Sequence, residues 1–251
     1  MISLSIIGTG NVAFHLANAF SSVQGVQLNY IVGRSTNALI DFKQLAKTTT
    51  DFSKIYSSEI ILIAVSDSSI AEVSKKIKST NSLIVHTSGS TPLDILNLHK
   101  RSGVFYPLQT FSKNKQLIYR EIPFCIEALL QEDVLVLTQL AEKINAQTFS
   151  ISSTERAALH LAAVFSNNFC NHILTEAKML CEVKNVSFDL LKPLMTETIS
   201  KAFLLGPENS QTGPAKRGDL STLEKQRNNL SSRQLELYNT LTHSILKFYE
   251  R

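Results

Sequence analysis

In the N-terminal part of the chain, short apolar runs alternate with stretches in which apolar residues recur at helical spacing. Ile2–Ile7 and Ile60–Val65 are uninterrupted runs of the length expected for strands buried on both faces. Helically spaced stretches follow, the first ending at Phe20 and the next covering Ile70–Lys78. This alternation predicts an α/β domain with a doubly wound parallel sheet over residues 1–152. Further strands are expected at Val26–Val32, Thr48–Asp51, Ser82–His86, Val104–Tyr106, Phe124–Ala128 and Gln147–Ile151, and further helices at Thr36–Lys47, from Thr91-Pro92 and at Glu132–Asn145.

The pattern changes at Ser152, which stands three residues before Glu155 in the spacing of a capping box. Only helical patterns follow, so residues 153–251 are predicted to form an all-helical C-terminal domain. Pro193 should kink its helix or mark a later start. The Pro- and Gly-rich segment Gly206–Asp219 is expected to be a loop without secondary structure. The helices are expected at Thr154–Lys184, Phe188–Leu205, Asp219–Leu230 and Ser232–Arg251.

The turn after the first strand has the order strand, glycine turn, helix that a dinucleotide site needs. Gly8 permits a tight turn, Gly10 lets a diphosphate approach the backbone, and Ala13 lets the helix lie close to the strand. The N–H groups at the start of the helix would bind the phosphates. A purely structural glycine turn is the alternative. The residues expected to bind the cofactor here are Gly8, Thr9, Gly10, Asn11 and Val12.

The second strand ends in Gly33-Arg34-Ser35, where an NAD site usually has an acidic residue for the ribose hydroxyls. A guanidinium can instead bind a 2′-phosphate through two hydrogen bonds, and a serine hydroxyl can add another. Arg34 and Ser35 therefore favour NADP over NAD. The alternative is that Arg34 is simply a solvated residue at a strand end.

The loops at the carboxyl ends of parallel strands should open on one crevice, where such sheets bind ligands. The predicted cofactor site therefore also includes Val65 and Ser66, at the end of the strand Ile60–Val65, and Ser88, just after the strand Ser82–His86. His86, at the end of its strand, is one candidate proton donor.

The long helix after Ser152 has two faces. A polar stripe combines His160, Asn167 and Asn168 with Val164 and Asn171. His160 could give a proton to a substrate as hydride arrives, and Asn167 or Asn168 could orient that substrate. A wet surface or the rim of a dimer is the alternative. The opposite, apolar face is expected to be buried and consists of Ala158, Leu161, Ala162, Phe165, Phe169 and Ile173.

A later charged segment, Thr212–Asp219, offers Lys216 and Arg217 as a clamp for an anionic substrate, with Asp219 as the cap of the next helix. A solvated charged turn is the alternative.

Composition narrows the classes of function. The 251 residues carry a formal net charge of +4, spread without a basic stripe, so nucleic-acid binding is not indicated. No apolar run is long enough to span a membrane, and we expect no signal peptide. Cys125, Cys170 and Cys181 have no metal-binding spacing, and scattered thiols suit a reducing cytoplasm.

Several motifs together resemble bacterial Rossmann-like proteins whose helical C-terminal half is catalogued as a domain of unknown function. Some of these are named NADP oxidoreductases of the deazaflavin-dependent type. More distantly, the chain is similar to pyrroline-5-carboxylate reductase and to the 6-phosphogluconate dehydrogenase-like group. The motifs are Gly8–Ala13, Ala64–Asp67, Val85–Ser90 (VHTSGS), Tyr106–Phe111 (YPLQTF), His160–Asn168 (HLAAVFSNN) and Thr212–Asp219 (TGPAKRGD).

The resemblance implies an NADP-binding N-terminal domain and helices that pair in a homodimer, with a small-molecule substrate bound between. We therefore expect an NADP(H)-dependent oxidoreductase acting on a carbonyl, imine or hydroxy compound. A non-catalytic NADP(H)-binding sensor is the alternative.

Overall fold

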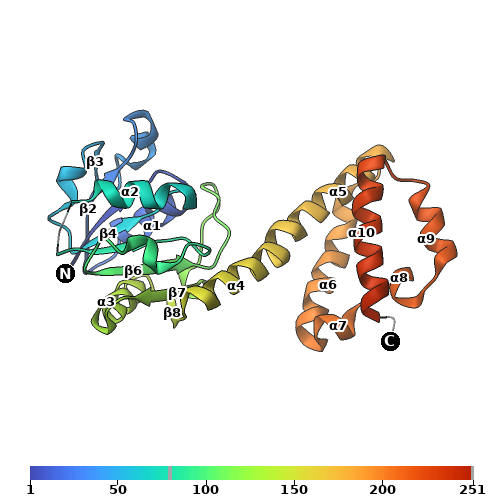
Figure 1. Ribbon diagram of the computed structural model, residues 1–251. Helices are drawn as coiled ribbons and strands as arrows, with labels where there is room; N and C mark the ends of the chain where they lie inside the picture. Colours follow the sequence, from blue (N-terminus) through green and yellow to red (C-terminus); the bar gives the residue numbers. More distant parts are fainter. Residues whose placement is uncertain (79–80, 250–251) are drawn as a thin grey trace. The chain divides into compact units, whose positions relative to one another are not determined.

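The computed structural model describes residues 1–78 and 81–249, which divide into two compact units, Met1–Asn167 and Asn168–Arg251 (Figure 1). The last two residues of the predicted C-terminal helix lie outside the described residues. The prediction of a sheet domain followed by a helical region is confirmed. The assignment of residues 1–152 and 153–251 to cofactor binding and to substrate binding or dimerisation stays a prediction.

The first unit is built on one mixed sheet with the strand order β3-β2-β1-β4-β5-β6-β7-β8. From β3 to β6 this is the strand order of the dinucleotide-binding folds. Successive strands are added on one side of β1 up to β3 and on its other side from β4 onwards, so the order reverses between β1 and β4. The strands are β1 (Ile2–Ile7), β2 (Val26–Val32), β3 (Lys47–Thr49), β4 (Ile60–Ile63), β5 (Leu83–His86), β6 (Ser102–Pro107), β7 (Pro123–Ala128) and β8 (Gln147–Ser150).

The sheet is not parallel throughout, which corrects the sequence-based expectation. β6 and β7 pair antiparallel, with Tyr106 opposite Cys125, and β8 is parallel to β7. A parallel return needs a crossover element that carries the chain back to the other end of the sheet. Between β6 and β7 the only regular element among the described residues is the 3₁₀ turn η5 (Tyr119–Glu121), so the chain returns antiparallel.

Alternate residues of the central strands enter two different cores, as the two-residue period of a strand requires. Leu4 and Ile6 of β1 join a cluster with α1 (Asn11–Ser21) and α3 (Gln131–Glu142). Ile7 joins a second cluster on the other face, with α2 (Ile70–Lys76). Helices therefore cover both faces, and ligands can approach only from the strand ends.

Two expected helices are shorter than predicted. Instead of a helix over Thr36–Lys47, the structure has the 3₁₀ helix η1 (Asn37–Phe42). Its buried residues, Leu39 and Phe42, lie three apart and so share a face of a 3₁₀ helix. The helix expected from Thr91-Pro92 is likewise a single 3₁₀ turn, η4 (Leu93–Leu96). Another 3₁₀ turn, η2, covers Phe52–Ile55.

The long helix after β8 is interrupted. It consists of α4 (Ser153–Ala163), the π-helical segment η6 (Val164–Phe169) and α5 (Cys170–Val183). Its predicted buried face is exposed: Leu161 is 60% and Phe165 64% accessible. Sequence periodicity correctly identified an apolar stripe on the helix, but periodicity alone does not show whether other residues of the chain cover that stripe.

The remaining helices lie in the second unit. As predicted, Pro193 marks a helix start, because it occupies the first turn of α6. The expected loop over Gly206–Asp219 instead contains two one-turn helices, each with proline in its first turn. The elements are η7 (Phe188–Leu191), α6 (Lys192–Leu205), α7 (Pro207–Ser210), α8 (Pro214–Arg217), α9 (Leu220–Arg227) and α10 (Ser232–Tyr249).

Helix α10 ties this unit together through side chains at both of its ends. Arg233 forms an ion pair with the buried Glu176 of α5 at 2.5 Å. At the other end, the Tyr249 hydroxyl donates to the Glu208 carbonyl at 2.7 Å, and the Lys216 ammonium lies 4.7 Å from the Tyr249 ring centroid. Among the described residues, no helix is long and apolar enough to cross a membrane.

We expect Gly8→Ala to lower the free energy of unfolding by about 2–4 kcal/mol, because Gly8 has a φ of +137° and a Cβ would lie 2.0 Å from the Ala64 carbonyl oxygen. Urea denaturation followed by circular dichroism measures the change. Gly10→Ala is the matched control, since a Cβ there would meet no described atom within 4 Å. Equal losses in the two variants would contradict this explanation.

Candidate functional site

The glycine turn Gly8–Gly10 follows β1, the strand at which the strand order reverses and which pairs with β2 on one side and β4 on the other. The Gly8 N–H donates to the Val32 carbonyl of β2 at 2.9 Å, and the Ala64 N–H donates to the Ile7 carbonyl at 2.7 Å. A side chain on Gly8 would collide with the Ala64 carbonyl. The turn is therefore held against both β2 and the end of β4, at the position where open α/β sheets bind ligands.

The start of α1 fits a bound diphosphate. Gly10 is the N-cap residue, and within the described part of the chain no side chain caps the helix. Asn11–Phe14 contains no acidic residue that would repel an anion. Since the space around a Gly10 Cβ is open, the N–H groups of the first turn can face a ligand.

Arg34 and Ser35 lie beside this turn. A Cβ on Gly33 would lie 3.0 Å from Cγ2 of Thr9, so the loops after β1 and β2 touch. Arg34 is exposed and forms no hydrogen bond or ion pair with any residue in 1–78 and 81–249. The positive charge of Arg34 contributes to lowering the pKa of Glu72 in α2, although Lys76 contributes more. The guanidinium is available for an anionic ligand.

A strap formed by residues 108–118 lies against α1, which the sequence did not predict. The Asn11 amide donates to the Phe111 carbonyl at 2.8 Å, and His15 Nε2 lies 2.9 Å from the Ser112 carbonyl. Lys113 pairs with Asp41 of η1 at 2.6 Å. The side chain of Asn11 is therefore engaged by the strap, and its backbone N–H remains for a ligand.

The loops after β4 and β5 are joined to each other. The Ser90 hydroxyl donates to the Asp67 carboxylate at 2.6 Å. Val65 is half-buried and Ser66 exposed, as a lining position requires. The Ser88 hydroxyl oxygen accepts hydrogen bonds from the Ser90 and Thr91 N–H groups at 3.2 and 3.0 Å. The Ser88 side chain therefore stabilises the turn in which it lies.

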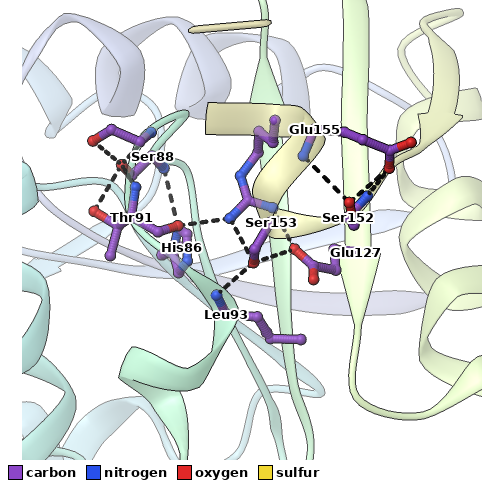
Figure 2. A network of polar contacts seen from close by, with 10 residues as sticks. His86, Ser88, Thr91, Leu93, Glu127, Ser152, Ser153 and Glu155 are labelled. Carbon is purple, nitrogen blue, oxygen red and sulfur yellow. Dashed lines mark hydrogen bonds and ion pairs between the residues drawn. The ribbon is translucent and has the colours of Figure 1, made fainter. Parts of the chain in front are cut away.

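The beginning of α4 is fixed to the sheet by a polar network (Figure 2). Ser152 and Glu155 form the predicted capping box. The Ser153 hydroxyl donates to the Glu127 carboxylate of β7 at 2.8 Å and accepts the Leu93 N–H at 2.9 Å.

Arg156 completes this network from inside the protein. It is almost fully buried, forms an ion pair with Glu127, and donates to the Thr91 carbonyl at 2.6 Å. Removing one member of such a buried pair is strongly unfavourable, so Arg156 fixes α4 against strand β7 and the loop after β5.

His86 lies beneath this network and is completely buried. Its Nδ1 accepts the Ser88 N–H at 3.2 Å. Burial lowers the pKa of His86 to about 4, and the Arg156 charge adds to the shift. The ring is neutral at pH 7 and does not reach the surface, so the structure does not support His86 as a group that meets a substrate.

His160 is brought to the carboxyl edge of the sheet, next to the end of β6. Its Nδ1 lies 3.0 Å from the Tyr106 hydroxyl. A Cβ on Gly89 would lie 2.6 Å both from this Nδ1 and from Cζ of Tyr106. Sequence reasoning proposed His160 but missed Tyr106, although the residue stands in the quoted YPLQTF motif.

The two predicted asparagines lie further along the same helical stretch. Asn167 and Asn168 are exposed within the π-helical segment η6. Such segments frequently occur at functional sites. Their role in orienting a substrate stays a prediction.

The charged segment near residue 216 is largely used internally. Asp219 caps α9 by accepting the Thr222 N–H at 3.1 Å, as predicted. The Lys216 ammonium donates to the Gln211 carbonyl at 2.9 Å. Of the two proposed clamp residues, Arg217 alone is exposed.

Comparison with known proteins identifies the family. A solved structure from Bacteroides fragilis, provisionally named an NADP oxidoreductase, is 33% identical to this chain; the match covers 98% of both chains with a TM-score of 0.90. The chain belongs to the family of this Bacteroides fragilis protein. Residues 122–245 of the chain match the domain of unknown function DUF2520. No curated protein matches the chain significantly.

More distant members of the comparison share the fold. A Thermotoga maritima protein is 22% identical over 98% of both chains, with a TM-score of 0.71. A reductive aminase from Aspergillus terreus, solved with NADPH and ethyl-5-oxohexanoate, is 15% identical over 98% of this chain and 94% of its own, with a TM-score of 0.70. The expected resemblance to NADP oxidoreductases with a C-terminal domain of unknown function is confirmed, whereas the deazaflavin-dependent type stays a prediction.

We expect stability to fall as the pH drops from 6.5 towards 4, because unfolded His86 takes up a proton in this range while folded His86 does not. The difference amounts to about 3 kcal/mol at full extent. His86→Asn, which keeps an acceptor for the Ser88 N–H, should reduce this pH dependence in urea titrations at several pH values. The exposed His243→Asn is the control and should keep the wild-type dependence.

Proposed function

We propose that this protein is an NADP(H)-dependent oxidoreductase that transfers hydride to or from a small carbonyl, imine or hydroxy compound. The observation that carries the proposal is the uncapped start of α1 at Gly10, with the exposed Arg34 beside it. Membership in the family of the Bacteroides fragilis protein agrees with it.

Each part of the cofactor has matching residues. The backbone of Gly8, Thr9 and Gly10, with the first turn of α1 at Asn11 and Val12, would bind the diphosphate. Arg34 and Ser35 would bind the 2′-phosphate, because a guanidinium forms paired, charge-assisted hydrogen bonds with phosphate oxygens. Val65, Ser66 and Ser88 would line the site beyond the diphosphate.

Bound NADPH supplies the hydride, and the protein supplies the proton and the orientation of the substrate. His160 is half-buried at the carboxyl edge of the sheet, so its ring can meet a ligand there. It would protonate the reduced atom of the substrate, while Asn167 and Asn168 would orient its polar groups. Distant similarity to a reductive aminase favours a carbonyl or imine substrate.

The activity is tested by offering NADPH and a panel of keto acids, ketones, cyclic imines and an oxidised deazaflavin, with NADPH oxidation followed at 340 nm. Turnover of at least one compound, abolished by heat denaturation, is the expected result. Tight NADPH binding without turnover of any compound would overturn the enzymatic proposal in favour of a non-catalytic sensor.

We expect Arg34→Glu to weaken NADPH binding by about tenfold to a hundredfold, while NADH binding is kept or improved, because the lost contact is a charge-assisted one to the 2′-phosphate. Titration calorimetry with both coenzymes measures this. Lys143→Glu makes the same charge change near Gly25, before β2, and should leave both affinities unchanged. Unchanged NADPH affinity in Arg34→Glu would reject the assignment.

We further propose that two copies pair through the helical region. Phe203 and Leu204 of α6 are 88% and 81% exposed, and Leu161 of α4 is also largely exposed. Neighbouring large apolar side chains exposed on one helix, as on α6, are typical of surfaces that associate.

In sedimentation velocity, the wild type should therefore run as a dimer, and Phe203→Glu/Leu204→Glu should shift it towards the monomer, because charges buried in an interface are strongly unfavourable. Leu129→Glu, an exposed apolar position of the sheet unit, is the control and should remain dimeric. A wild type that sediments as a monomer would refute the pairing.

A further inference from the structure

Tyr106 and His160 form a hydrogen-bonded pair from elements far apart in the sequence. Tyr106 lies near the end of β6, His160 in the second half of α4, and the hydroxyl oxygen is 3.0 Å from Nδ1. The rings meet edge to face, with centroids 5.8 Å apart. Tyr106 is only 9% exposed, whereas His160 is half-buried. Within residues 1–78 and 81–249, Nε2 of His160 has no hydrogen bond.

The surroundings leave this pair little freedom. Gly89 passes so close that a single methyl group there would come within 2.6 Å of both rings. Four residues before His160, on the same face of α4, the buried Arg156 is held by Glu127 and the Thr91 carbonyl. The backbone that carries His160 is therefore fixed, and the ring is fixed on its Nδ1 side.

The Tyr106 hydroxyl remains protonated at neutral pH, since burial raises its pKa to about 12. A neutral imidazole has one nitrogen that donates and one that accepts, and the partner of one nitrogen decides which is which. When the hydroxyl donates to Nδ1, the proton of the neutral ring must be on Nε2. When the ring is protonated on both nitrogens, the same hydroxyl can turn and accept from Nδ1.

We infer that Tyr106 is a positioning residue that holds Nδ1 of His160, donating to it in the neutral ring and accepting from it in the protonated ring, so that Nε2 is the nitrogen presented to the hydride acceptor. This inference rests on the proposed function, because it assigns the atom of His160 that meets the substrate. A hydroxyl partner serves both forms of the ring, which suits a group that gives up a proton and takes one back.

Bound NADPH would supply hydride to the carbonyl carbon. As the π electron pair of the C=O bond moves to oxygen, that oxygen would take the Nε2 proton of the doubly protonated His160 ring. The products are the alcohol, NADP⁺ and neutral His160, whose remaining proton on Nδ1 is hydrogen-bonded to the Tyr106 oxygen. Return of a proton from solvent restores the starting form. An imine is reduced in the same way, with nitrogen in place of oxygen.

The test compares Tyr106→Phe with Tyr119→Phe in the full chain. Tyr119 is a matched control: burial raises its pKa to about 12 as well, and its hydroxyl donates to the His15 carbonyl at 2.7 Å. Each variant loses one hydroxyl and one hydrogen bond, so both melting temperatures should fall by a similar amount, about 2–4 °C. Stability alone therefore does not distinguish them.

The deciding measurement is the tautomer of His160, read from long-range ¹H–¹⁵N correlations of histidine-labelled protein at pH 8. His160→Gln identifies the signals. We expect wild type and Tyr119→Phe to show an unprotonated Nδ1 and a protonated Nε2, and Tyr106→Phe to move both signals towards a mixture of tautomers. Identical His160 signals in wild type and Tyr106→Phe would overturn the inference.

Kinetics add a second readout on whichever compound of the panel is turned over. Tyr106→Phe should lower kcat about tenfold with an unchanged KM for NADPH, and Tyr119→Phe should stay within about twofold of wild type. An unchanged kcat in Tyr106→Phe would overturn the positioning role. A panel without turnover counts against the proposed function, while the tautomer measurement, which needs no coenzyme, still decides the pairing.

Discussion

The close approach between Gly8 and the Ala64 carbonyl is the constraint on which the rest of the first unit depends. With a φ of +137° and no room for a Cβ, the chain can turn here only with glycine. This turn holds β1 between β2 and β4 and starts α1 at the point where the strand order reverses. The helix start and the Thr9–Gly33 contact lie at that one turn, with Arg34 following Gly33, so the proposed coenzyme site depends on backbone geometry as well as on individual side chains.

A second, charged interaction extends this arrangement to α4. Arg156 is buried, and its hydrogen bonds reach both the loop after β5 and strand β7. A buried guanidinium is costly unless nearly all of its donors are used, so it favours one position of the helix over others. The position that it favours places His160 against Tyr106. The chemistry proposed for His160 therefore depends on a residue that does not itself touch the surface.

Much of the first unit could be predicted from sequence, because buried strands and a glycine turn leave local signals. Ile60–Ile63 is apolar at every position, and Gly8–Ala13 follows a strand directly. The capping box at Ser152 and the helix start at Pro193 are equally local. The antiparallel β7 was not predictable in this way, because strand direction depends on what the connecting segment can cross.

The site residues also divide into those with a local sequence signal and those whose position depends on distant parts of the chain. Periodicity identified His160 as part of a polar stripe, but its partner Tyr106 lies 54 positions away and has no local signal of the contact. Likewise, the strap over α1 is held by backbone carbonyls of Phe111 and Ser112, which any residue type could supply. Burial of the apolar stripe with Leu161 was predicted wrongly, since a pattern shows that a face is apolar and says nothing about whether its cover belongs to the same chain.

The antiparallel return after β6 also determines which way the chain leaves the sheet. β7 and β8 run against the other strands, and Ser150, the last residue of β8, is level through Ile126 with Phe105 of β6, close to the carboxyl edge of the parallel strands. The helix that follows reverses the direction of β8: α4 begins beside Glu127, and its second half lies beside Tyr106 and Gly89. With eight strands all running one way, the same helix would begin at that edge and lead away from it, so only its first turn, and not a residue of its second half, could place an imidazole there.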